Sequence, residues 1–275
     1  MSPILIAAAA AAQSPTPAAP APGADANRFQ TCVAQVRAAP EQAVTAANAW
    51  VVEGGGLPAR QCLGLAFVAL GRWASAATVY EQGARAAEAA GDSRRADFWV
   101  QAGNAWLASG DPARALQALD AALATPLLTD ELRGEVHLDR AQAMVAQANA
   151  LGARGEVDRA LELVPADPFG WYLSAAIAEL ENNLERARSD IARARELAPE
   201  DPDIMLLAGT IAGLSGNGAE TERLYRAVIA AAPESDAARR AQAALATMRD
   251  VPPEGAAAPG AQTQQPPQQP APQPR

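Results

Sequence analysis

Large and small apolar residues recur in a fixed order along the middle of the chain. In residues 96–129 the order is a large residue, a small pair, an aromatic residue, a turn glycine, then Ala, a large residue and Ala again. The positions are filled by Trp99, Ala102, Gly103, Trp106, Gly110, Ala115, Leu119 and Ala122. Apolar residues three or four positions apart mark one face of a helix, and Gly110, Asp111 and Pro112 supply a stop, a cap and a first-turn proline. The pattern predicts two helices joined by a tight turn.

The same order returns with a period of about 34 residues, which is typical of a repeat architecture. We place five copies, at about 57–90, 96–129, 134–167, 168–201 and 202–235. The last three copies abut, since Pro165, Pro199 and Pro233 stand 34 residues apart. The third copy is the weakest, because Ala148 replaces its turn glycine.

This order of residues closely resembles the tetratricopeptide consensus, and five copies in one frame make the resemblance specific. It implies an all-α fold, a right-handed α-solenoid of helix-turn-helix repeats. One helix pair cannot bury its apolar face alone, so stability comes from stacking between neighbouring repeats. A degenerate repeat is expected at 27–56, where Trp50 follows the small residues Ala43 and Ala47, and a capping helix at 236–250. The solenoid would thus span residues 27–250.

Cys32 and Cys62 are the only cysteines of the chain. On the repeat alignment they fall on the first helices of two consecutive repeats, and such helices are neighbours in the family that the chain resembles. A bridge between them is therefore geometrically reasonable. In an exported protein two cysteines usually form one disulfide. Two unlinked buried thiols are the alternative.

The two ends of the chain differ from the repeats. Residues 1–12 resemble the end of a secretory signal peptide, and their closing Ala residues fit the small-residue cleavage rule. No Lys or Arg precedes the apolar stretch, so either the true start lies upstream or the resemblance is accidental. Residues 13–26 and 251–275 are rich in Pro and are predicted to be disordered. We expect a periplasmic or secreted protein, with no membrane insertion of the mature chain because no stretch approaches a transmembrane length.

Composition and charge narrow the function classes. Hydrophobic residues make up 49% of the chain but aromatic residues only 4%, and Ala supplies much of the apolar fraction, which favours helices over sheet. The net charge of −9 is spread without a long block of one sign, which argues against binding of nucleic acid.

Motifs for catalysis or metal binding are missing from the sequence. His137 is the only histidine, which excludes metal sites built on two imidazoles of one chain, and it occupies a packing position of the third repeat. No nucleophile elbow, Walker loop or H-E-x-x-H motif occurs. We expect a protein that is not an enzyme and that uses no cofactor and no metal.

In the tetratricopeptide family the first helices of the repeats line a concave groove, which usually holds a bound peptide. Carried onto this chain, the groove positions are mostly aliphatic, with isolated amides among them. They are Gln61, Leu65, Val68, Val100, Asn104, Leu107, Leu138, Gln142, Val145, Tyr172, Ala176, Glu179, Leu206, Thr210 and Leu214. The basic partners by which one subgroup grips acidic chain ends are missing, so we expect an apolar segment or helix as ligand, its backbone paired with Asn104 and Gln142. The alternative is that some of these aliphatic residues belong to the core between repeats.

These features favour a non-enzymatic scaffold or adaptor of the bacterial cell envelope that binds a protein or peptide. One alternative is a structural solenoid that self-associates through its ends. The other is an accessory subunit of an envelope enzyme. A resemblance at the level of the fold leaves the bound partner and the oligomeric state open.

Overall fold

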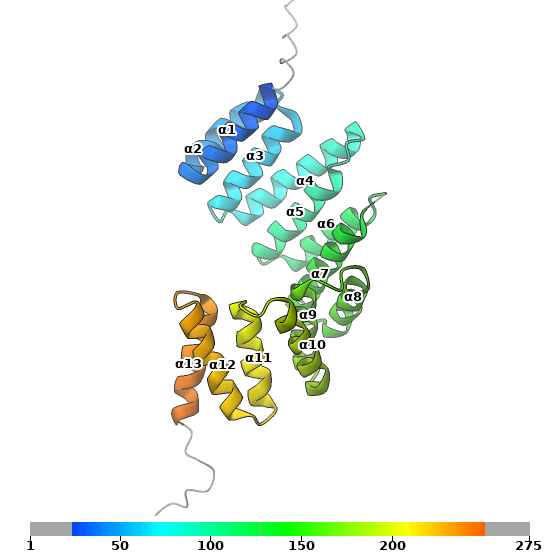
Figure 1. Ribbon diagram of the computed structural model, residues 1–275. Helices are drawn as coiled ribbons and strands as arrows, with labels where there is room; N and C mark the ends of the chain where they lie inside the picture. The colour runs from blue at the N-terminus through cyan, green and yellow to red at the C-terminus, as the bar shows by residue number, and fades with distance from the viewer. Residues whose placement is uncertain (1–23, 127, 251–275) are drawn as a thin grey trace, which may run out of the picture. The chain divides into compact units, whose positions relative to one another are not determined.

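The computed structural model describes residues 24–126 and 128–250 (Figure 1). Over these residues every regular element is a helix, thirteen in all, which confirms the predicted all-α class. The predicted signal peptide at 1–12 and the predicted disordered tail at 251–275 lie outside the described residues. So does most of the leader predicted at 13–26, although its last residues already belong to a helix that begins at Ala24.

The chain divides after Glu181 into two compact units, Met1–Glu181 and Asn182–Arg275. This division falls inside the fourth predicted repeat. The described part of the first unit, which we call unit 1, contains nine helices. They are α1 (Ala24–Ala38), α2 (Pro40–Val52), α3 (Gly56–Ala69), α4 (Trp73–Ala90), α5 (Arg95–Ala108), α6 (Pro112–Leu123), α7 (Asp130–Ala146), α8 (Ala150–Leu163) and α9 (Pro168–Leu180).

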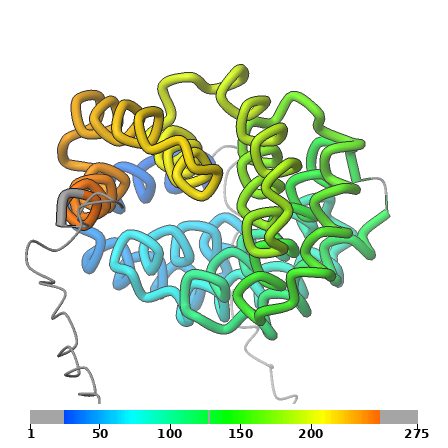
Figure 2. The backbone as a smooth tube through the Cα atoms, turned by 90° about the horizontal axis from the view of Figure 1, so that it is seen from below, coloured from blue at the N-terminus to red at the C-terminus, as the bar shows by residue number. Residues whose placement is uncertain are grey.

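Helices that follow one another in unit 1 pack side by side, so the unit is a stack of antiparallel pairs (Figure 2). In addition α1 contacts α3, α5 contacts α7, and α7 contacts α9. These odd-numbered helices therefore form one layer of the stack. They are the first helices of the predicted repeats.

The turn between α5 and α6 shows how the sequence ends one helix and begins the next. Gly110 adopts a φ of 81°, a conformation that a residue without Cβ takes freely. Asp111 then caps α6 by accepting a hydrogen bond from the amide of Arg114, and Pro112 fills the first turn. In the third repeat Ala148 takes the same left-handed conformation, with a φ of 58°. The turn geometry is thus kept without its glycine, at a cost of about 1–2 kcal/mol.

Close packing within the helix pairs depends on glycines that face large side chains. Gly64 of α3 lies against the buried ring of Tyr80, and Gly103 of α5 lies against Leu119. The aromatic rings of α5 fill the remaining space, and their polar edges are satisfied. The indole nitrogen of Trp106 donates to Glu81 at 2.7 Å. The core of unit 1 is therefore built from small and large residues that alternate between facing helices.

A disulfide joins Cys32 of α1 to Cys62 of α3, as the sequence predicts. The two Cα atoms are 6.1 Å apart, and both side chains are buried. The bridge lies in an apolar cluster with Trp50 and Leu63, against which Phe29 packs. It fastens the N-terminal helix to the first complete repeat.

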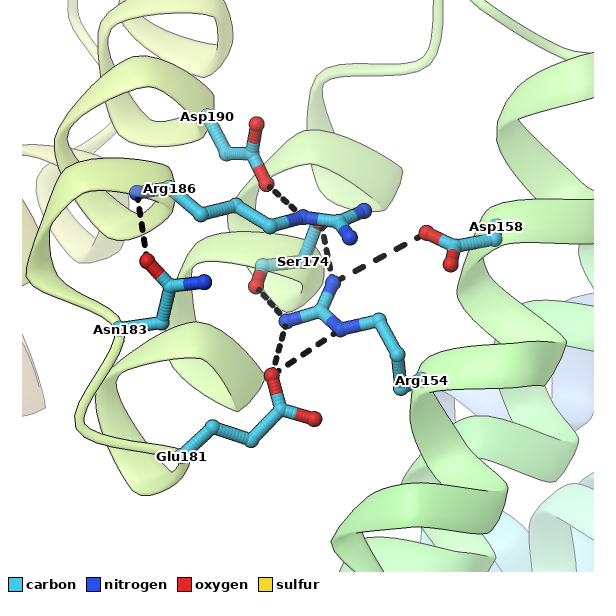
Figure 3. Close-up of polar contacts among 7 residues, drawn as sticks. All are labelled: Arg154, Asp158, Ser174, Glu181, Asn183, Arg186 and Asp190. Carbon is cyan, nitrogen blue, oxygen red and sulfur yellow. Dashed lines mark hydrogen bonds and ion pairs between the residues drawn. The ribbon is translucent and has the colours of Figure 1, made fainter.

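A buried charge holds α8 to α9, which the sequence analysis does not predict (Figure 3). Arg154 of α8 is only 8% exposed. Its guanidinium donates to the hydroxyl of Ser174 at 2.7 Å and to the carbonyl oxygen of Ser174 at 2.9 Å. It also donates to a carboxylate oxygen of Glu181 at 3.2 Å. Hydrogen bonds to several acceptors are what a buried guanidinium needs, so this contact is structural.

The second unit, unit 2, contains α10 (Leu184–Leu197), α11 (Pro202–Leu214), α12 (Gly218–Ala231) and α13 (Asp236–Asp250). Its apolar cluster joins Leu206 of α11 and Val228 of α12 to Leu245 of α13, so the last helix covers the end of this unit. On α10, Arg186 donates to Asp190 at 3.2 Å (Figure 3). No helix among the described residues is both long enough and apolar enough to span a bilayer.

Candidate peptide-binding groove

Three adjoining pockets run along the layer of first helices in unit 1. Their volumes are about 450, 340 and 560 Å³. Gln61 and Gln101 line both the first and the second pocket, and Asn104 lines both the second and the third. The three pockets therefore adjoin one another across α3, α5 and α7, and we call them together the α3–α5–α7 groove.

The walls of this groove are mainly apolar. Phe29, Pro58 and Phe98 line the first pocket, and Leu65 and Val68 line the second. Leu107 and Ala108 line the third pocket. Leu65 and Val68 stand three positions apart on α3, so the helical period brings them to one face of that helix.

Polar side chains are spaced along the groove between the apolar ones. The amide nitrogen of Gln61 donates to the amide oxygen of Gln101 at 2.8 Å, which links α3 to α5. An amide side chain carries both donors and an acceptor. The pair therefore leaves an acceptor on Gln61 and a donor on Gln101 for a ligand. Asn104 lies one turn further along α5 and is exposed.

Asp139 of α7 lines the third pocket and is partly buried. Burial raises the pKa of its carboxyl group from 3.8 to about 7, the hydrogen bond from Asn104 lowers it in part, and the negative charge of Glu135 raises it further. Gln142 donates a second hydrogen bond, from its amide nitrogen to the Asp139 carboxylate at 3.3 Å. The groove thus contains a carboxyl group that titrates close to neutral pH.

Six of the fifteen groove positions predicted from the sequence line the groove. These are Gln61, Leu65, Val68, Asn104, Leu107 and Gln142. Val145 and Tyr172 are partly buried and lie outside the lining of the three pockets.

Three further positions, Val100, Leu138 and Leu206, are at most 9% exposed and belong to the apolar clusters of their units. They are removed from the set of ligand contacts, because they pack in the core. Val100 shares its cluster with Ala84 and Ala87 of the preceding repeat, and Leu138 shares its cluster with residues of the following one. This is the alternative that the sequence analysis left open.

Two polar groove residues that the sequence analysis missed directly follow two of the buried ones. Gln101 follows Val100, and Asp139 follows Leu138. One residue turns the side chain by about 100° around a helix, so the aliphatic residue points to the neighbouring repeat and the polar one to the groove. A signal for them is present in the sequence, because Gln101 and Asp139 are polar residues at the same position of two successive repeats.

Solved structures with a similar arrangement of helices are numerous. One is PilW, described as a widely conserved type IV pilus biogenesis factor, which matches with a TM-score of 0.64 and 20% identity over 80% of this chain and 98% of PilW. Pseudomonas aeruginosa PilF matches with a TM-score of 0.63 and 17% identity over 81% of this chain and 98% of PilF. TTC0263, a tetratricopeptide-repeat protein of Thermus thermophilus, matches with a TM-score of 0.57 and 19% identity. The match covers 70% of this chain and all of TTC0263.

The protein has the tetratricopeptide-repeat fold. Neither a scan against protein-family models nor a comparison with curated proteins by sequence gives a match. Because the identities are at most 20%, these structures establish the fold of the chain. This fold is the one that the resemblance in the sequence predicts.

Within the tetratricopeptide-repeat fold of this chain, the polar clusters away from the groove are structural. The ring of His137 hydrogen-bonds through Nδ1 to the buried carboxylate of Glu156 at 2.7 Å, and Arg140 donates to the same oxygen at 3.0 Å. Burial raises the pKa of Glu156, but these two hydrogen bonds outweigh it and the pKa falls to about 2. Across residues 24–126 and 128–250, no group of three or more His, Cys, Asp and Glu residues could hold a metal ion. His137 therefore links α7 to α8, in addition to the packing role that its position predicts.

Proposed function

We propose that the protein is a non-enzymatic adaptor that holds a peptide segment of a partner protein in the α3–α5–α7 groove. The observation that carries this proposal is the row of three adjoining pockets on one layer of helices, which offers places for several ligand side chains. Apolar walls with a few spaced polar groups are the usual lining of a ligand site in a protein. The amides of Gln101 and Asn104 are available for the ligand backbone, and the walls accept its side chains.

The helices that line the groove pack closely against the second helices of their repeats. Gly64 and Gly103 allow α3 and α5 to approach α4 and α6, and the disulfide joins α1 to α3. A preformed groove loses little conformational entropy when a ligand binds, so it can hold a short segment with useful affinity. Each Leu- or Val-sized side chain that the ligand buries contributes roughly 1.5–3 kcal/mol.

The cell envelope is the proposed location. The resemblance of residues 1–12 to a signal peptide and the disulfide both favour an oxidising compartment. PilW, whose fold this chain shares, is described as a type IV pilus biogenesis factor. Together these observations support an adaptor for an envelope assembly.

Replacing Val68 and Leu107 by Asp should remove the apolar contacts of the second and third pockets. Both side chains are partly buried and line the groove from different helices. A carboxylate forced against an apolar ligand loses its hydration, so we expect at least a 100-fold loss of affinity, about 2.7 kcal/mol. Crosslinking in the cells that produce the protein, followed by recovery of the full chain, would identify the partner and measure the loss.

The matched control is Leu151→Asp, which adds the same charge at a side chain of α8 that is 83% exposed. This variant should recover the partner as the wild type does. Circular dichroism and thermal unfolding of all variants show that the helices remain. A partner recovered equally well with the Val68 and Leu107 variant would reject the groove as its binding site.

A further inference from the structure

We propose that the α3–α5–α7 groove selects segments that carry a Lys or Arg between apolar residues, and that Asp139 is the carboxylate that receives this cation. The inference rests on the proposed function and names the chemistry of its ligand. It follows from the position of Asp139, from the charges around it and from the shape of the third pocket.

Asp139 lies at the wall of a pocket of about 560 Å³, together with Asn104, Leu107, Ala108 and Gln142. Its two hydrogen-bond partners are the amides of Asn104 and Gln142. Amides orient a carboxylate but do not neutralise its charge. The apolar surface of Leu107 and Ala108 beside it suits the aliphatic stem of a Lys or Arg, whose charged end would then reach Asp139.

Within the described residues, the charge that acts on Asp139 is the negative charge of Glu135, one turn earlier on the same helix. The neighbouring cation on α7, Arg140, is engaged elsewhere, by Asp120 of α6 and Glu156 of α8. Among the described residues, no cation contributes to the pKa of Asp139. The carboxylate therefore has no positively charged partner that holds it in the ionised form.

The charged residues in the rest of the groove also leave an excess of negative charge. Asp97 of α5 lines the first pocket. Arg94, which also lines it, pairs with Asp92 at 2.7 Å. A groove whose carboxylates exceed its available cations attracts basic segments and repels acidic ones, which gives selectivity as well as affinity.

The partly buried carboxylate is costly to the folded chain in the absence of a ligand. The pKa of Asp139 is raised above its ordinary value, so this group contributes most to stability below about pH 4, and the contribution is lost as the pH rises to about 7. An Asn at this position does not titrate. We expect Asp139→Asn to raise the Tm at pH 8 by about 4 °C or more, and the gain to shrink steadily between pH 7 and pH 4. A group that lowers the stability of the folded chain is typical of a functional site.

A selection from a random peptide library displayed on phage tests the proposal, with the immobilised full chain as bait at pH 8. We expect the selected peptides to carry Lys or Arg at one position flanked by apolar residues. A selected peptide, synthesised and titrated, should bind Asp139→Asn at least 30-fold more weakly. The same peptide should bind the wild type about tenfold more weakly at pH 5.5 than at pH 8, because Asp139 is then protonated before binding.

The matched control is Glu131→Gln, which removes one negative charge from an exposed position of the same helix. It should bind the selected peptide within about twofold of the wild type, as expected for an exposed charge at a distance. Selected peptides without a basic residue, or basic peptides that bind Asp139→Asn as tightly as the wild type, would overturn this inference and leave the groove a binding site. Failure to select any peptide with a folded bait would overturn the proposed function and this inference together.

Discussion

Replacing Cys32 and Cys62 together by Ala is expected to lower the free energy of unfolding of unit 1 by about 3–4 kcal/mol. The two residues are 30 positions apart, so the bridge removes a large part of the freedom of the unfolded N-terminal segment. Both side chains are buried against Trp50 and Leu63, and Ala fits these sites without leaving a polar group unpaired. The loss should be confined to unit 1, because the bridge lies entirely within it.

Denaturant unfolding, followed with and without a reducing agent, measures this effect. Reduction should destabilise the wild type by nearly the same amount and leave the double variant unchanged. Titration of the thiols in the native, purified protein is the accompanying control. Two free thiols, or a wild type whose unfolding ignores the reductant, would show that the bridge does not stabilise the protein.

Replacing Gly64 by Ala is expected to destabilise unit 1 by about 2–3 kcal/mol. A Cβ atom at this position would overlap the ring of Tyr80. The ring has little room to move, because it is 3% exposed and lies beside Phe98, with the two ring centroids 6.4 Å apart. The substitution therefore forces α3 away from α4 and disturbs the wall of the groove that α3 supplies.

The control for this substitution is Gly155→Ala, in the middle of α8. A Cβ atom there meets no atom within 4 Å, so the substitution should stabilise the protein by about 0.4–1 kcal/mol through the lower entropy of the unfolded chain. Thermal unfolding of the two variants should therefore shift in opposite directions. Equal stability of Gly64→Ala and the wild type would mean that α3 and α4 do not need this close approach.

The fold could be predicted from the sequence because the same order of small and large residues recurs along the chain. A small residue at the place of Gly103 and a large residue at the place of Leu119 return in each repeat, and each has a definite packing role. The helix starts follow from the same signals, since Asp167, Asp201 and Asn217 cap helices in the structure. Local chemistry and the repeat period agree, which is why the helix pairs could be placed without the structure.

The candidate site could be predicted only in part. The repeat pattern does not distinguish the face of a helix that lines the groove from the face that packs against the next repeat. An aliphatic residue near the groove and one in the core between repeats look alike in the sequence, and Val100 and Leu138 were therefore misplaced. The contact of Arg154 with Ser174 could not be found either. It joins two residues 20 positions apart whose types are ordinary on a helix surface, and only packing shows that they are buried.

The central claim is that the α3–α5–α7 groove holds a partner, and photo-crosslinking from single positions tests it most directly. A photoreactive amino acid is introduced at Val68 or Leu107 in the groove, and at the exposed Leu151 of α8 as control, in the cells that make the protein. We expect a discrete adduct with the same partner from both groove positions and none from Leu151. No adduct from either groove position, or the same adduct from Leu151, would contradict it.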